Sequence, residues 1–160
     1  MVQKKRIIIV FAVLNLWIIG FTSVPLLKTT APTLANSISD VVGRTCHQIP
    51  NRSLYIDGSP IAVCARCTAV YIAGWVVLIL YFLRGKIRLF PGYLYLLCTA
   101  PMILDFILEK MSIYHNLTAV RLITGGLFGL TLFHLMIVSM QSDDDVSLHS
   151  RGQAWKIKES

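Results

Sequence analysis

The chain of 160 residues has a hydrophobic fraction of 55%, a charged fraction of only 14% and a mean hydropathy of +0.65. A soluble domain carries about 25% charged residues, and a chain this short cannot bury so much apolar surface in one water-surrounded core. The composition therefore excludes an ordinary soluble domain and predicts a single membrane domain. The net charge of +7 does not indicate nucleic acid binding, because the basic residues flank apolar runs and form no aromatic-interleaved patch.

Four apolar runs predict membrane-crossing helices at about 7–27, 62–83, 89–108 and 117–140. The first run is longer than the core of a signal peptide, which favours a retained helix over a cleaved one. Pro101 lies inside the third run, where it removes a backbone donor and should kink the helix. Gly125 and Gly129 in the fourth run have the spacing that lets two helices approach closely.

Short basic segments determine the predicted orientation. They lie at 4–6, 84–88 and 151–158, which four crossings place on the same side of the membrane. Because short basic loops stay in the cytoplasm, we expect both termini to be cytoplasmic and the loop at 28–67 to be extracytoplasmic. The sequence thus predicts an all-α, four-helix transmembrane bundle over residues 1–140, followed by a polar cytoplasmic tail over 141–160.

The loop at 28–67 contains three of the four cysteines, Cys46, Cys64 and Cys67, beside His47. A Cys-x2-Cys pair with one more cysteine and a histidine is a donor set typical of tetrahedral zinc. Cys46 and His47 are adjacent, so binding of both to one ion needs an unusual chain geometry. Three cysteines with an open fourth position, as in catalytic zinc sites, are the equal alternative. Cys98 lies in the third helix, and we expect it to be a buried, inert residue.

The same cysteines support two other hypotheses. An extracytoplasmic Cys-x2-Cys pair can form a disulfide, and both Arg66 and a helix beginning after Cys67 favour the thiolate. A membrane thiol–disulfide oxidoreductase using Cys64 and Cys67 is therefore the first alternative. A structural disulfide in a non-catalytic assembly module is the second, and whether the site is catalytic at all stays open.

Two charged residues lie within the predicted bilayer. Asp105 and Arg121 are each about one turn inside the outer end of their helix, so they lie at similar depth, and Glu109 shares the face of Asp105. Charges in the hydrocarbon are costly and indicate function by default. We expect either an ion pair between Asp105 and Arg121 or a polar pocket beneath the cysteine loop. In the pocket hypothesis, the metal or Asp105 acts on a substrate whose anionic group Arg52, Arg66 and Arg121 hold.

The polar residues also resemble a known pattern. Cys46-His47-Gln48, Pro50-x-Arg52-Ser53 and Val63-Cys64-Ala65-Arg66-Cys67-Thr68 resemble the signature of a prokaryotic family of small predicted membrane proteins, a domain of unknown function. Members continue with Pro-x-x-x-Asp, then with an asparagine and Arg-x-x-Thr-Gly, matched by Pro101 and Asp105 and by Asn116 and Arg121 to Gly125. The resemblance covers roughly residues 40 to 130. It implies a family and a site but no activity, and Ala69 and Ala73 stand where glycine is common.

Taken together, these features predict a multi-pass protein of the prokaryotic cytoplasmic membrane with an extracytoplasmic metal site, zinc by its donor set, above a polar intramembrane pocket. The expected substrate is lipid-linked or otherwise anionic. Membrane lipid is the expected partner, nucleic acid is not, and a homo-oligomer is left open.

Overall fold

The computed structural model describes residues 2–56, 58–85, 87–111 and 118–158, and it is built almost entirely from helices. Four of them are long and apolar enough to cross a membrane, over Lys4–Thr30, Ala65–Arg84, Gly92–Lys110 and Thr118–Ser142. The predicted all-α class with four spans is confirmed. The elements in chain order are α1 (Val2–Thr30), α2 (Pro32–Gly43), the 3-10 helix η1 (Pro50–Arg52), β1 (Ser53–Ile56), β2 (Ser59–Cys64), α3 (Ala65–Arg84), α4 (Gly92–Lys110) and α5 (Thr118–Lys158).

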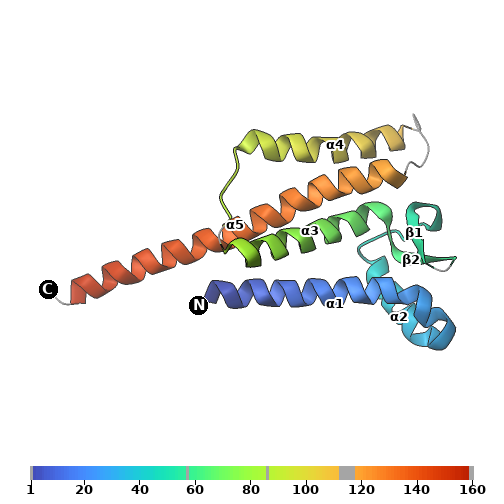
Figure 1. Ribbon diagram of the computed structural model, residues 1–160, viewed down its shortest axis with the longest axis horizontal. Helices are drawn as coiled ribbons and strands as arrows, with labels where there is room; N and C mark the ends of the chain where they lie inside the picture. The colour runs from blue at the N-terminus through green and yellow to red at the C-terminus, as the bar shows by residue number, and fades with distance from the viewer. Residues whose placement is uncertain (1, 57, 86, 112–117, 159–160) are drawn as a thin grey trace.

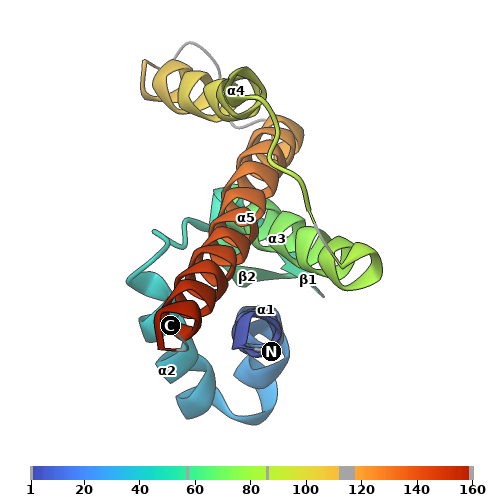
Figure 2. The same cartoon turned by 90° about the vertical axis from the view of Figure 1, so that its left-hand side faces the viewer.

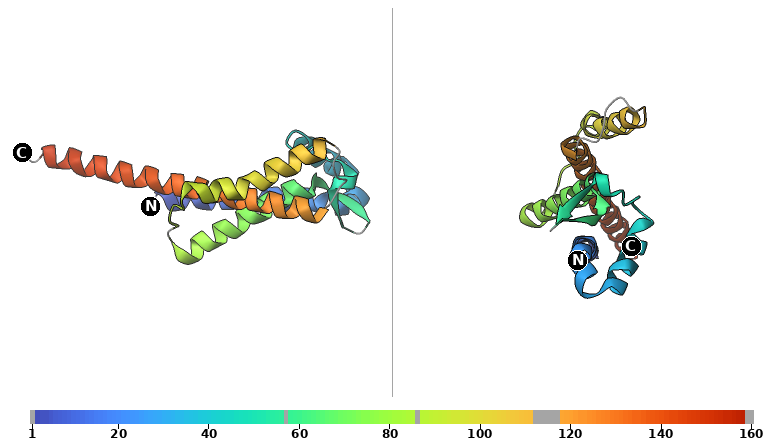
Figure 3. Two further views of the ribbon diagram at one scale, coloured as in Figure 1. Left: turned by 90° about the horizontal axis from the view of Figure 1, so that it is seen from above. Right: turned by 90° about the vertical axis from the view of Figure 1, so that its right-hand side faces the viewer.

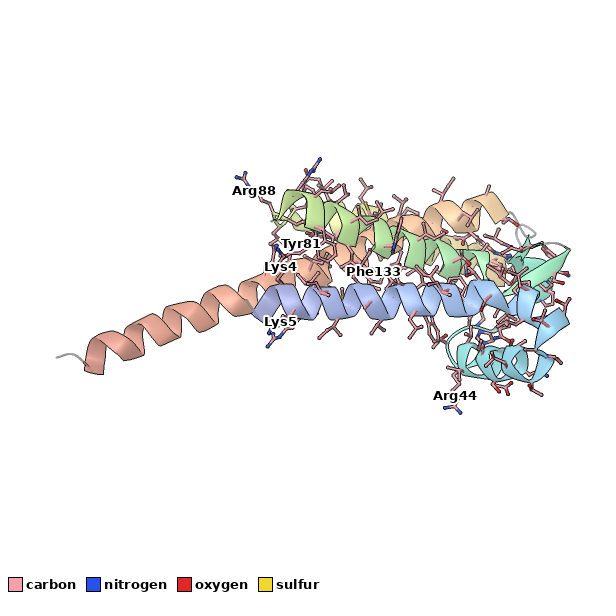
Figure 4. All side chains as sticks on the ribbon, turned by 60° about the horizontal axis from the view of Figure 1, so that its bottom comes forward. Lys4, Lys5, Arg44, Tyr81, Arg88 and Phe133 are labelled. Carbon is pink, nitrogen blue, oxygen red and sulfur yellow. The ribbon has the colours of Figure 1, made fainter. Side chains whose placement is uncertain are left out.

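The four long helices run along the longest axis of the molecule, and its two ends differ in character (Figure 1). The N-terminus and the connection between α3 and α4 lie at one end, where Figure 4 places Lys4, Lys5 and Arg88. α2 and the hairpin of β1 and β2 lie at the other end, seen face-on in the right-hand view of Figure 3. The basic segments and the cysteine segment are thus separated by the length of the bundle.

α3 and α5 pack against each other through glycines, as the small-residue spacing predicted. A Cβ atom added at Gly125 would lie 2.5 Å from the carbonyl oxygen of Arg66, and one added at Gly129 would lie 2.5 Å from that of Val70. The reverse contact exists as well, because a Cβ at Gly74 of α3 would collide with the ring of Phe133. Since an alanine fits at none of these positions, the glycines determine how closely the two backbones approach.

Two clusters of buried apolar side chains join α1 to the rest of the bundle. One joins α1, α3 and α5 and is visible around Tyr81 and Phe133 in Figure 4; it comprises Ile7, Leu14, Val77, Leu78, Tyr81 and Ile137. The other joins the end of α1 to α2 and β2 and comprises Phe21, Val24, Val42, Cys46, Ile61, Ala62 and Val63. The second cluster holds Cys46 in place, so the cysteine segment is anchored in the core of the molecule.

α4 is the least buried of the four spans and packs beside the first part of α5 (Figure 2). Leu96 and Leu97 are 73% and 67% exposed, as expected for side chains that face lipid. Within α4, all of which the structure describes, Asp105 is the one buried residue. The helix thus packs beside α5 with a charged group as its one fully buried residue, and the Tyr95 hydroxyl also contacts His134 of α5 at 3.1 Å.

The segment predicted as a loop at 28–67 has more structure than its sequence indicated. α1 continues to Thr30, α2 follows directly with Pro32 in its first turn, and a hairpin forms around Gly58, whose φ of 75° favours glycine. The second span begins at Ala65, not near residue 62, because Ile61–Val63 belong to β2. A short apolar run of this kind fits a strand or a helix equally well by pattern, and pairing with β1 decides for the strand.

The fourth span ends at Ser142, close to the expected residue 140. The helix itself, however, continues as α5 to Lys158, through the segment that the sequence predicted as a polar tail.

Candidate functional site: three thiols and an ion-pair cluster

Three cysteines from three different elements converge at the hairpin end of the bundle. Cys46 follows α2, Cys64 ends β2 and precedes the first residue of α3, and Cys67 lies in the first turn of α3. Their sulfur atoms all lie within 4.8 Å of one another, and all three are free thiols. The predicted convergence of Cys46, Cys64 and Cys67 is confirmed.

The chain around Cys46 is folded so that donors surround its sulfur. Gln48 has a φ of 50°, an uncommon conformation for a residue with a side chain, and its amide donates to the carbonyl oxygen of Ser39 at 2.6 Å. The backbone N–H of Cys64 donates to the Cys46 sulfur at 3.2 Å. Hydrogen bonds from the thiols of Cys64 and Cys67, and from the backbone of Gln48 and Cys64, hold the pKa of the Cys46 thiol far below its usual range. These hydrogen bonds favour the thiolate form of Cys46, and thiolate is the form that binds a metal.

The fourth residue of the predicted donor set, His47, and the fourth cysteine, Cys98, lie outside the thiol cluster. His47 is exposed and lines the same cavity as the cysteines, but its ring is outside the set of three groups that could share one ion. Cys98 lies in α4 outside the thiol cluster, as predicted, but it is half-buried rather than buried. Within the described residues, the metal donors that converge are therefore the three sulfurs.

A carboxylate that the sequence analysis did not assign to the site is the centre of its charged part. Glu109 of α4 accepts contacts from three guanidinium groups, those of Arg121 at 2.5 Å, Arg52 at 2.8 Å and Arg66 at 3.1 Å. The signal for Glu109 was present, because it is four residues from Asp105 on one helical face. The structure thus brings all three predicted arginines together, around a residue that had been noted only as a neighbour.

Asp105 and Arg121 each contact another charged residue of the site. Asp105 contacts the guanidinium of Arg66 and accepts a hydrogen bond from the Thr124 hydroxyl at 3.3 Å, whereas Arg121 contacts the neighbouring Glu109. The reason is tertiary: the close contact at Gly125 brings the start of α3 against α5, so the side chain of Arg66 reaches α4. Asp105 and Arg121 are both buried, each 3% exposed.

The thiols and the charged cluster line one cavity of about 540 Å³. Four cationic side chains and one carboxylate face it, together with an apolar wall from Met102 and Phe106 of α4. Asn116, part of the resemblance noted above, lies outside the described residues. The lining residues are Thr45, Cys46, His47, Gln48, Ile49, Arg52, Cys64, Arg66, Cys67, Met102, Phe106, Glu109, Lys110 and Arg121.

These features define an integral membrane protein with four apolar spans, in which a cluster of three thiols and a group of ion pairs share a cavity at one end of the bundle. Residues 46–135 match the family described as "Predicted membrane protein (DUF2085)", which covers more than half of the chain. The chain belongs to this family. The matched range begins at Cys46 and includes every residue of the two clusters.

A curated relative is similar over 90 residues of the chain. It is "Uncharacterized protein MJ1492" of Methanocaldococcus jannaschii, 36% identical over 90 residues, which are 54% of this chain and 58% of the relative. The chain thus matches less than two thirds of that protein's length. No solved structure matches.

Proposed function

We propose that this protein binds zinc at Cys46, Cys64 and Cys67, on the extracytoplasmic face of the membrane, and acts there on an anionic, lipid-linked substrate. The observation that carries the proposal is the convergence of three thiols from three elements on one cavity. His47 lines the cavity as a neighbour of this donor set. The cationic lining, with Arg52, would hold the substrate's anionic group.

The donor set fits zinc by its chemistry. Sulfur atoms about 2.3 Å from one tetrahedral zinc ion lie about 3.8 Å from one another, and the three sulfurs here lie within 4.8 Å. The hydrogen bonds received by Cys46 stabilise a thiolate, and the positive end of the α3 dipole lies at Cys64 and Cys67. A metal with three protein ligands keeps its fourth position for water or substrate, and in that position it polarises the bound oxygen.

The extracytoplasmic side is supported by the distribution of charge along the bundle. Lys4, Lys5 and Arg88 lie at the end opposite to the thiols (Figure 4), and short basic segments stay in the cytoplasm. A membrane-impermeant thiol reagent, applied to intact cells after reduction and removal of metal, should label Cys46, Cys64 and Cys67. Labelling that requires permeabilised cells would reverse the orientation.

Elemental analysis combined with thiol counting on the purified protein tests the metal site. We expect one zinc per chain with reduced thiols, and a large loss of zinc in each of the variants Cys46→Ser, Cys64→Ser and Cys67→Ser. Cys98→Ser is the matched control and should retain its zinc, because Cys98 is outside the group. Full zinc content in all three site variants would place the metal elsewhere.

The second candidate is a membrane thiol–disulfide oxidoreductase, favoured by the lowered pKa of Cys46 beside two further thiols. A low-pKa thiol next to a partner thiol is the arrangement that such enzymes use. The same measurement separates the two candidates. A protein without metal that contains a reducible disulfide among these cysteines would support the oxidoreductase over the zinc site.

A further inference from the structure

The cavity carries more positive than negative charge. Arg52, Arg66, Arg121 and Lys110 line it, whereas Glu109 is the one carboxylate in its lining, and Asp105 lies behind Arg66. A divalent metal with three thiolates adds one net negative charge. Four positive groups then stand against three negative ones among the described residues of the site. At a membrane boundary, where charge is costly to leave uncompensated, such an excess favours an anion.

The three arginines are not equivalent. Arg121 is 3% exposed and Arg66 14%, and each is fixed between helices by a carboxylate. Arg52 is 44% exposed, and the Glu109 oxygen that it contacts at 2.8 Å is the same one that Arg121 contacts. Arg52 can therefore exchange Glu109 for an incoming anion while Arg121 keeps the carboxylate neutralised.

Part of the cavity wall is apolar and belongs to the helix that faces lipid. Met102 and Phe106 of α4 line the cavity, and Phe106 is 56% exposed. A site that combines cationic groups with a lipid-facing apolar wall matches a molecule that has an anionic head and an apolar chain. Such molecules with a phosphate head make up the membrane surface itself.

We propose that the cavity binds a phosphate group, and that Arg52 is the side chain that leaves Glu109 to pair with it. A guanidinium group matches phosphate with two parallel hydrogen bonds, which an ammonium group cannot do. Lys110, exposed at the end of α4, adds a second positive charge at the mouth of the cavity. The inference rests on the proposed function, because it gives the anionic substrate of that proposal a chemical class.

The test uses the full chain, purified in mild detergent, and two phosphate probes. Inorganic phosphate is titrated in one arm, and nanodiscs that contain phosphatidic acid in a phosphatidylcholine background are used in the other. Binding to phosphatidic acid alone identifies a lipid headgroup as the source of the phosphate, and binding to inorganic phosphate alone identifies the free ion. Either result supports the inference, and binding of neither probe would overturn it.

The decisive comparison is between two exposed arginines. Arg52→Gln should weaken binding about tenfold or more, as expected for loss of hydrogen bonds to a charged group. Arg44→Gln removes the same charge at the end of α2, outside the cavity (Figure 4), and should bind like the wild type. An equal loss of phosphate affinity in both variants would mean that the phosphate is attracted by surface charge in general. An unchanged affinity in Arg52→Gln would show that Arg52 does not bind the phosphate.

A third variant and a second measurement keep folding and metal binding separate from phosphate binding. Arg52→Lys retains the charge but not the paired hydrogen bonds, so its affinity should fall between those of the wild type and Arg52→Gln. Zinc content, measured on the same samples, should be unchanged in all three variants, since no arginine is a metal ligand. If the wild type contains no zinc but still distinguishes Arg52→Gln from Arg44→Gln, the zinc proposal fails and the phosphate site stands.

Discussion

α3 and α4 are apolar helices of nearly equal length, and they join the bundle by opposite means. α3 buries eight residues and meets α5 through glycines at backbone contact distance. α4 buries Asp105, and its contacts with the site are ion pairs of Asp105 and Glu109. In lipid, apolar side chains gain no hydrophobic free energy by leaving the lipid for another helix. Close packing and polar contacts are therefore the main interactions that hold helices together. α3 relies mainly on close backbone packing, whereas α4 adds buried ion pairs to its packing against α5.

This difference has a consequence for the site. Asp105 and Glu109, two of the groups that hold α4, line or flank the cavity, so the position of α4 depends in part on the charge state of the site. A ligand that competes for Glu109 would act on the helix as well as on the arginines. α3, held by its backbone, supplies the fixed side of the cavity with Cys64, Arg66 and Cys67.

The largest effect should come from removing the buried charge of α4. Asp105→Asn leaves the guanidinium of Arg66 without one of its two carboxylates in a place of low dielectric. Breaking a buried pair from one side costs about 3–5 kcal/mol, so we expect a loss of that size in the free energy of unfolding, measured by SDS titration in mixed micelles. Lys110→Gln, on the same helix but exposed, should change it little. Equal losses would show that α4 is not held by its buried charge.

Adding one methyl group at Gly125 should destabilise the contact between α3 and α5. Gly125→Ala places a Cβ against the carbonyl oxygen of Arg66, a backbone atom that cannot rotate away, and overpacking of this kind costs about 1–3 kcal/mol. Gly126→Ala is the matched control, because nothing lies within 4 Å of a Cβ there. The same unfolding measurement should find the control as stable as the wild type. A neutral Gly125→Ala would contradict the close approach of the two helices.

The zinc content of two variants should show whether α3 or α4 supports the thiol cluster. Because Cys64 and Cys67 belong to the fixed side of the cavity, Asp105→Asn should disturb α4 more than the metal, and its zinc content should stay near the wild-type value. Gly125→Ala shifts the start of α3 and should lower the zinc content. Elemental analysis of both variants checks this order, and the reverse order would mean that α4 supports the thiol cluster.

The smallest effect on stability should be that of Arg52→Gln. Its ion pair with Glu109 is partly exposed, and pairs of this kind contribute about 0–1 kcal/mol. We therefore expect the free energy of unfolding to change by less than about 1 kcal/mol, while phosphate binding falls. A loss as large as that of Asp105→Asn would make Arg52 a structural residue.

Much of the site was readable from the chain because it depends on local spacing. The Cys-x2-Cys pair, the charges within apolar runs and the four-residue step from Asp105 to Glu109 all follow from sequence alone. The role of Glu109 did not, since spacing places it beside Asp105 but cannot tell that three arginines from three elements meet it. The pairing of Asp105 with Arg66 was missed for the same reason.

What the sequence by itself determined is therefore the membrane class, the four spans, the small-residue contact and the set of polar residues that matter. Composition and periodicity decide these, because each helix satisfies its own backbone and has to be apolar to cross a bilayer. What only the tertiary structure decided is which of these residues touch. The hairpin at Gly58 brings Cys64 into contact with Cys46. The glycines of α5 let the start of α3 approach closely, which places Arg66 within reach of α4. Both depend on contacts between segments far apart in the chain, which no local pattern encodes.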